Sequence, residues 1–80
     1  MDNHLLSRIT MDEGICNGKP VIRNMRFTVA QMLELVAAGM AFDEILADYP
    51  YIERDDISAC LLYASAVINN KGIVFINASA

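Results

Sequence analysis

The chain has 80 residues, 55% of them hydrophobic, and a formal net charge of −4. This length predicts a single domain, and because a chain of this size buries only about 60% of its unfolded surface, so high an apolar content favours a homo-oligomer, a dimer or higher. The acidic balance argues against general affinity for nucleic acid, and no apolar run approaches the ~18 residues that span a bilayer, so we expect no membrane partner and a cytoplasmic location.

Residues 8–28 are predicted to form a β-ribbon, after a loose start over residues 1–7. Asn17-Gly18 favours a tight hairpin turn, because both central residues of such a turn have positive φ. Pro20 lacks an N–H donor and so marks a strand start or an edge. Residues 23–26 separate two short apolar runs and predict a second turn.

Residues 29–70 are predicted to form a body of three helices. Thr28 and Gln31 fit a capping box at the start of the first helix, and Gly39 ends it as a left-handed cap. Its buried stripe is Val29, Met32, Leu33, Val36 and Met40. The second helix starts at Ala41 or Phe42 and stops at Pro50. Its inner face is Phe42, Ile45, Leu46 and Tyr49.

The third helix is predicted to start near Glu53 or Arg54. Its inner stripe is Ile57, Cys60, Leu61, Ala64 and either Val67 or Ile68. After a helix exit at residues 69–72, residues 73–76 read as a short apolar strand. The fold class expected is therefore mainly α, with a small N-terminal β-ribbon, a trihelical, helix-turn-helix-like body and a C-terminal strand or tail over 71–80.

The pattern Ile-Cys-x-Gly-Lys-Pro-x-Ile-Arg-x-x-Arg at residues 15–26 resembles the opening motif of the family called domain of unknown function 433. The similarity extends over residues 8–66. It departs from the family at Asn17, at Asn24-Met25, and at Ala41 and Glu53, where Gly, Gly-Thr and Ser or Thr are usual. The family comprises small bacterial and archaeal proteins, many of them thought to be VapB-type antitoxins. The resemblance implies a homeodomain-like trihelical unit and a toxin partner such as a PIN-like ribonuclease.

No residue pattern points to catalysis, to a metal or to a cofactor. The one histidine, His4, lies in the loose start, and two cysteines with one histidine cannot complete a zinc site. Cys16 and Cys60 are better explained as reduced thiols than as a disulfide. The acid pairs at 43–44 and 55–56 fit helix N-terminal charges better than catalytic carboxylates. We therefore expect a non-enzyme.

Two groups of residues are candidates for binding. Residues 14–28 carry three cations and no acid, whereas residues 29–68 hold seven acids and one arginine. The candidate DNA contacts, for an operator, are Lys19, Arg23 and Arg26. The alternative is a solvated tip, or pairing with acids of the same domain. The candidate partner or dimer contacts are Leu62, Tyr63, Ile73, Val74, Phe75 and Ile76.

The excess of apolar residues predicts a small oligomeric binding protein, and the resemblance implies that it is the antitoxin of a toxin–antitoxin system, which inhibits a partner toxin. Residues 73–76 would pair with a second copy. The alternative is a DNA-binding transcriptional regulator without a toxin partner, and a third interpretation is a structural homodimer.

Overall fold

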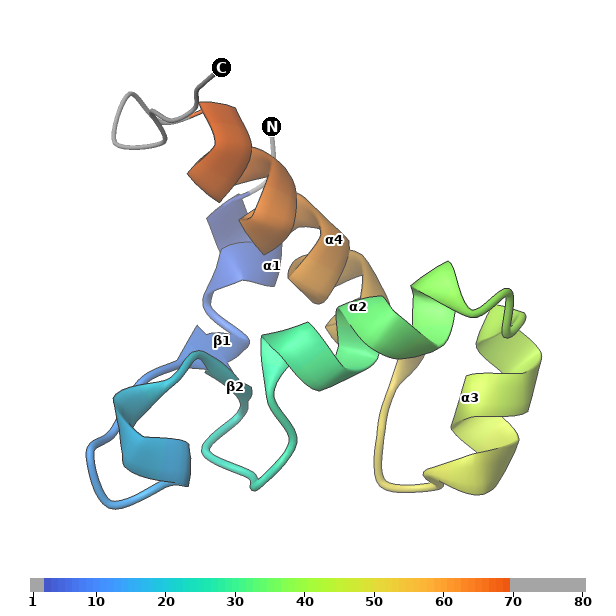
Figure 1. Cartoon of the computed structure of the whole chain (residues 1–80), viewed down its shortest axis with the longest axis horizontal. Helices are drawn as coiled ribbons and strands as arrows, with labels where there is room; N and C mark the ends of the chain where they lie inside the picture. Colours follow the sequence, from blue (N-terminus) through green and yellow to red (C-terminus); the bar gives the residue numbers. More distant parts are fainter. Residues whose placement is uncertain (1–2, 70–80) are drawn as a thin grey trace.

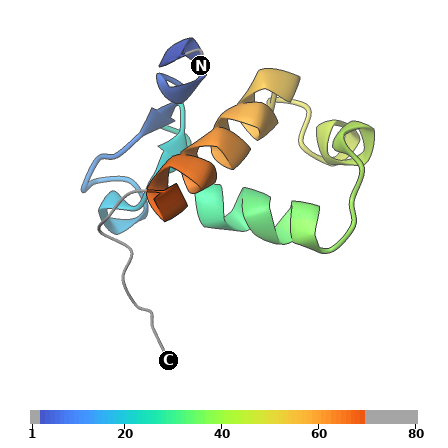
Figure 2. The same cartoon turned by 90° about the horizontal axis from the view of Figure 1, so that it is seen from above.

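The structure is a computed structural model that describes residues 3–69. In chain order its elements are α1 (Asn3–Leu6), β1 (Ile9–Thr10), the 3-10 turn η1 (Cys16–Gly18), β2 (Val21–Ile22), α2 (Val29–Ala37), α3 (Phe42–Asp48) and α4 (Arg54–Asn69). Helix α4 packs against α1, α2, α3 and β1, and Figures 1 and 2 show it running between the N-terminal elements and α2. The prediction of a mainly helical fold with a small N-terminal ribbon is therefore confirmed, and the strand expected at 73–76 lies outside the described residues.

The start of the described chain is helical, so the expectation of a loose start is wrong for residues 3–6. Helix α1 packs against α4, and its two leucines, Leu5 and Leu6, are half-buried. The Ser7 hydroxyl donates to the His4 carbonyl at 2.6 Å, and the Arg8 N–H donates to the Leu5 carbonyl at 3.1 Å. Burial against a neighbouring helix stabilises a segment that is too short to be helical alone.

The sheet pairs β1 with β2 in antiparallel register, with Ile9 opposite Ile22 and Thr10 opposite Val21. The other side of β2 is also paired, because Val21 bridges to Thr28 and the Ile22 N–H donates to the Phe27 carbonyl at 3.0 Å. The strand after Pro20 is therefore in the middle of the ribbon, and Pro20 precedes its first residue.

A tight turn connects β2 to the segment that precedes α2, as predicted for residues 23–26. Arg23 and Asn24 both have positive φ, at 44° and 58°, and the Met25 N–H donates to the Ile22 carbonyl at 2.8 Å. Two successive left-handed residues are the signature of the hairpin turn that matches strand twist. Arg23 is a long side chain in a backbone region that favours glycine, so the turn stores strain.

The turn expected at Asn17-Gly18 has a different form. Asn17 and Gly18 do have positive φ, but they lie in η1, inside the connection of residues 11–20. The tight turn of this connection lies earlier in the sequence, at residues 12–15. There Asp12 bridges to Ile15, and the Asp12 carboxylate accepts the Gly14 N–H at 2.8 Å. An aspartate that accepts a hydrogen bond two residues on favours the turn at that point.

Helices α2 and α3 begin and end where the sequence predicted. The Thr28 hydroxyl accepts the Gln31 N–H at 3.0 Å, and Gly39 adopts a φ of 93° just after α2. At the start of α3, Ala41 has no capping side chain, but its N–H donates to the Glu44 carboxylate at 2.8 Å. The Glu44 side chain thus supplies half of a capping box where the usual Ser or Thr is missing.

The core lies where α2, α3 and α4 meet the ribbon. Its buried hydrophobic residues are Val21, Ile22, Phe27, Val29, Met32, Ile45, Ile52, Ile57, Ala59 and Cys60. The predicted stripe of the third helix is wrong at Leu61 and at its end, because Leu61, Val67 and Ile68 are all exposed. Tyr63, which was not part of that stripe, packs against the core. Within residues 3–69, no helix is long and apolar enough to cross a membrane.

Candidate functional site

The first turn of α4 buries a carboxylate. The Asp56 side chain is fully buried, and two arginines from the N-terminal part of the chain bind it. Arg23 donates from Nε to Oδ1 at 3.0 Å and from Nη2 to Oδ2 at 2.7 Å, which is a bidentate pair. Arg8 donates from Nη1 to Oδ1 at 2.9 Å. We call Arg8, Arg23 and Asp56 the ionic cluster.

Two backbone groups and the Glu53 side chain complete the ionic cluster. The Glu53 N–H donates to Asp56 Oδ2 at 2.8 Å, so Asp56 also caps the start of α4. Arg23 Nη2 donates to the Tyr51 carbonyl at 3.0 Å, and Arg8 Nη1 donates to Glu53 Oε1 at 2.7 Å. The cluster therefore ties the ribbon turn and the end of α1 to the α3–α4 connection.

Each residue of the ionic cluster stabilises the charged form of its partners. Burial alone would raise the pKa of Asp56, but the hydrogen bonds from Arg23, from the Glu53 N–H and from Arg8 outweigh it and hold that pKa below its usual range. The pKa of Arg23 is raised by its bond to Asp56, and the pKa of Arg8 is raised by its bonds to Glu53 and then Asp56. Asp56 accepts four hydrogen bonds, so its two oxygens are saturated.

The structure separates the three cations expected to contact DNA. Arg23 is held by Asp56, as the alternative interpretation of the basic ribbon had it. Lys19 and Arg26 are exposed, and within residues 3–69 neither forms an ion pair with an acid. The exposed carboxylates of Glu53 and Asp55 lie beside Arg8 in the same region and would repel phosphates.

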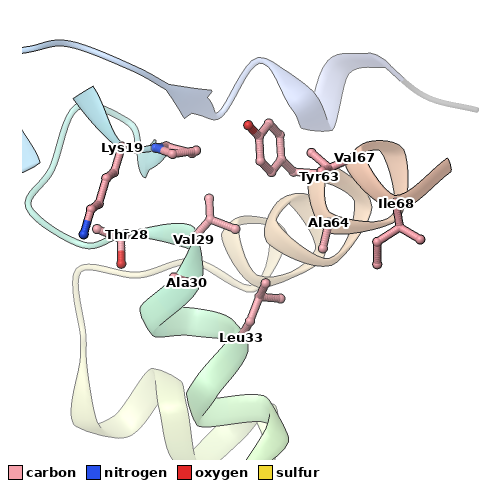
Figure 3. Close-up of a pocket in the computed structure, with 10 residues that line it drawn as sticks. Lys19, Thr28, Val29, Ala30, Leu33, Tyr63, Ala64, Val67 and Ile68 are labelled. Atoms are coloured by element: carbon pink, nitrogen blue, oxygen red, sulfur yellow. The ribbon is translucent and has the colours of Figure 1, made fainter. Parts of the chain in front are cut away.

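A second feature is an apolar groove of about 350 Å³ between α2 and the C-terminal half of α4. Figure 3 shows side chains of the two helices facing a common space, with Val29 and Leu33 on one side and Tyr63 and Ala64 on the other. The complete lining is Lys19, Pro20, Thr28, Val29, Ala30, Leu33, Tyr63, Ala64, Val67 and Ile68. We call this the α2–α4 groove.

The α2–α4 groove is almost free of charge. Residues 57–69, which make up most of α4, contain no charged side chain, and Lys19 is the one charged residue of the lining. Val67 and Ile68 are 37% and 67% exposed. Apolar side chains that gather on an exposed surface without charges mark a site of interaction.

The candidate interface residues fall in different places. Tyr63 lines the α2–α4 groove, whereas Leu62 is half-buried and is not part of the lining. The other candidates, residues 73–76, lie outside the described residues. Both cysteines are free thiols, and burial raises the pKa of Cys60 to about 12. Within residues 3–69, no group of three or more His, Cys, Asp or Glu side chains could hold a metal.

Sequence reasoning missed two features of this region. Asp56 was interpreted only as a helix N-terminal charge, because one-dimensional spacing does not show that two arginines bind it. Val29 and Leu33 were predicted to belong to a buried stripe; Val29 is buried and Leu33 packs against the core, but both residues also line the groove, which the prediction did not include. The signal for the groove is the absence of charged residues over 57–69. A surface helix that buries only one face carries charged or polar side chains on its other face, so their absence indicates an additional apolar surface.

Residues 9–64 match the family model described as "Protein of unknown function (DUF433)". No curated protein and no solved structure matches the chain.

Proposed function

The chain belongs to the DUF433 family, and we propose that it functions by binding a partner protein in the α2–α4 groove. The observation that carries the proposal is the groove itself. It is open and apolar, has a volume of about 350 Å³, and is bordered by the half of α4 that carries no charged residue. Water-exposed apolar surface of this kind is unfavourable unless something covers it, and a partner that buries it gains free energy.

The lining defines the chemistry of the partner. The two walls are helices, so the groove fits a short apolar segment laid between them, as in helix-in-groove recognition. Lys19 lies at the edge of the groove, and a carboxylate at the matching end of the segment would pair with it. The partner segment we propose therefore carries apolar side chains and one acidic residue.

In biological terms, this is the antitoxin interpretation. The resemblance of residues 8–66 supports a partner toxin such as a PIN-like ribonuclease, and the apolar groove supports a role in protein binding rather than in catalysis. We propose that the antitoxin acts as a homodimer or higher oligomer, because large apolar residues are exposed within residues 3–69, namely Met11, Tyr51, Leu61, Val67 and Ile68.

A DNA-binding regulator with a helix-turn-helix-like body of α2, α3 and α4 is the second candidate. The observation that favours it is the exposure of Lys19 and Arg26. Because Asp56 holds Arg23, we expect Arg26→Ala to weaken operator binding and to reduce its salt dependence by about one phosphate contact. Binding that depends on Arg54 alone would contradict this arrangement and favour the helix start as the contact.

The experiment for the first candidate uses a matched pair of substitutions on α4. Val67 and Leu61 are 37% and 38% exposed, but only Val67 lines the groove. The chain is co-expressed with the product of the neighbouring gene, and the complex is measured by co-purification and by neutralisation of toxicity. We expect Val67→Glu to abolish the complex and Leu61→Glu to leave it intact.

Two results would count against the proposal. A complex that tolerates Val67→Glu would move the interface away from the groove. A neighbouring protein that neither co-purifies nor is neutralised would remove the antitoxin interpretation. Melting curves of both variants confirm that the helices remain folded.

A further inference from the structure

A stripe of α4 runs along the outer side of the helix, apart from most of the α2–α4 groove. Its members are Ser58, Leu61, Ser65 and Ile68, and their alternating spacing of three and four keeps them on one side of the helix. Leu61 is 38% and Ile68 is 67% exposed, and Ser65 is exposed as well. Of the four residues, Ile68 alone also lines the groove. We call them the outer stripe of α4.

We propose that a second copy of the chain packs its own outer stripe against this one, with the two α4 helices antiparallel. The inference names the interface of the proposed homodimer and rests on that part of the proposed function, but it needs no partner protein. Figure 1 shows the last turns of α4 extending beyond α2, where a second helix can reach them. The same surface would serve in both copies, which makes the contact isologous.

The outer stripe matches itself when one copy is reversed. Leu61 lies four residues before Ser65, and Ile68 lies three residues after it. A two-fold axis at Ser65 therefore places Leu61 of one copy beside Ile68 of the other. The small serine at the axis lets the two helices approach, and the large side chains on either side of it fill the space between them. An isologous interface requires such a match of a surface with itself.

The hydroxyl group at the proposed axis has a hydrogen-bond partner in its own helix. The Asn69 side chain donates from Nδ2 to Ser65 Oγ at 3.4 Å. The serine O–H can rotate, so it can also donate to Ser65 of the second copy. A buried polar group that keeps its hydrogen bonds costs little, so this serine is compatible with a closed interface.

Charge favours a second copy, and it favours the antiparallel orientation. The chain has a net charge of −4, so two copies repel one another wherever charged surfaces meet. Residues 57–69 carry no charge, and contact along them avoids that repulsion. The acids of α4 lie in its first turn, where Asp55 is 64% exposed. Antiparallel helices keep the two Asp55 side chains about 30 Å apart, well beyond the screening length of roughly 8 Å, whereas parallel helices would bring them together.

The proposed dimer and the proposed partner use neighbouring faces of α4. Ile68 belongs to both surfaces, so the second copy would border the α2–α4 groove without filling it. Val67 lines the groove and is not part of the outer stripe. A single pair of helices makes a small interface, so we expect a dimer that dissociates on dilution.

The experiment measures the mass of the full-length chain alone, by sedimentation equilibrium over a dilution series. We expect a mass that approaches twice the 8.8 kDa of the chain at high concentration and falls towards the monomer on dilution. Ser65→Glu places two carboxylates at the axis and should leave the chain monomeric. Ala66→Glu is the matched control, because Ala66 is exposed but lies about 100° round the helix, and it should keep the dimer. Circular dichroism checks that both variants remain helical.

Further variants separate this interface from the groove. Ser65→Lys alone should also be monomeric, but an equimolar mixture with Ser65→Glu should restore the dimer, because opposite charges then meet at the axis. Val67→Glu, which should abolish the complex with a partner protein, should leave the dimer intact. Leu61→Glu should do the reverse, weakening the dimer and leaving the complex with the partner.

A cross-link tests the orientation of the helices. In a chain with Cys16→Ser the remaining thiol is Cys60, which is buried and has a pKa raised to about 12, so it resists oxidation. Adding Ser65→Cys should give a disulfide between two copies, because cysteines at the axis come within bonding distance. Adding Leu61→Cys should not, because antiparallel helices hold the two positions about 12 Å apart.

Four results would overturn the proposal. A chain that stays monomeric at every concentration has no such interface. A dimer that survives Ser65→Glu, or that dissociates with Ala66→Glu, uses another face. A dimer lost with Val67→Glu would place the second copy in the groove. A disulfide through Leu61→Cys in place of Ser65→Cys would make the helices parallel.

Discussion

At its first turn, α4 buries a carboxylate that accepts four hydrogen bonds, whereas its later turns carry no charge and border an open groove. The ionic cluster holds together three parts of the chain that are distant in sequence. The α2–α4 groove leaves apolar side chains in contact with water. At one end of α4 the buried polar group has all its hydrogen bonds, and at the other end apolar side chains remain exposed.

This difference separates stability from binding along a single element. A buried ion pair is costly to break, because removal of one partner leaves the other charge without compensation. A half-exposed apolar residue contributes little to folding, but it can contribute much to a complex. Substitutions at the two ends of α4 should therefore have different consequences, and the predictions below test that separation.

The largest expected effect is at Asp56. We expect Asp56→Asn to lower the free energy of unfolding by about 2–3 kcal/mol, somewhat less than for a fully buried pair, because Arg8 and Arg23 keep partial access to water. Urea denaturation measures it. Asp55→Asn is the matched control, since Asp55 is 64% exposed and should cost less than about 0.5 kcal/mol. Equal losses in the two variants would contradict a special role for the ionic cluster.

The pH dependence of stability should follow the same carboxylate. The folded-state pKa of Asp56 is lowered, so its stabilisation is complete above the unfolded value of about 3.9 and is lost as the pH falls through the lower folded value. We expect the urea midpoint to fall on acidification below about pH 4. In Asp56→Asn this fall should be smaller. An unchanged profile would assign acid sensitivity to other carboxylates.

An intermediate effect is expected for the arginines of the ribbon. Arg23→Gln removes the bidentate pair with Asp56 and should lower the free energy of unfolding by about 1–2 kcal/mol. Arg26→Gln, three residues away on an exposed side chain, should change it by no more than about 0.5 kcal/mol. A similar loss in both variants would mean that the ribbon responds to its total charge.

The smallest effect on folding is expected in the groove. Val67→Glu and Leu61→Glu should each change the free energy of unfolding by less than about 1 kcal/mol, because both side chains are more than a third exposed. Thermal denaturation by circular dichroism measures this. A severe loss for Val67→Glu alone would show that the groove is part of the folding core and would break the separation between the two ends.

Local signals in the sequence predicted the elements well. Thr28, Gly39 and Pro50 mark helix ends through their own side chains or backbone angles, so their effects can be read within a few residues. The turn at residues 23–26 was found for the same reason. Helix α1 was missed, since its stability comes from packing on α4 and not from its four residues.

The candidate site depends on contacts that periodicity does not contain. Asp56 and Asp55 look alike as acids in a first turn, and only the return of Arg8 and Arg23 makes one of them buried. Leu61 and Val67 both fit an apolar stripe, but the positions of α2 and of residues 19–20 decide that only Val67 borders a groove. A helix that is apolar on several faces indicates that other elements pack on those faces. It does not show which face is left partly exposed.

The ionic cluster also sets an order of events during synthesis. Asp56 lies 48 positions after Arg8 and 33 after Arg23, so both arginines emerge from the ribosome well before their common acceptor. Contacts so distant in sequence carry a large loop-closure cost and form late in folding. We expect the strained ribbon turn to lack its contacts with Asp56 while the nascent chain is still being made. The N-terminal third of the protein should become resistant to proteolysis only after the first turn of α4 has emerged from the ribosome.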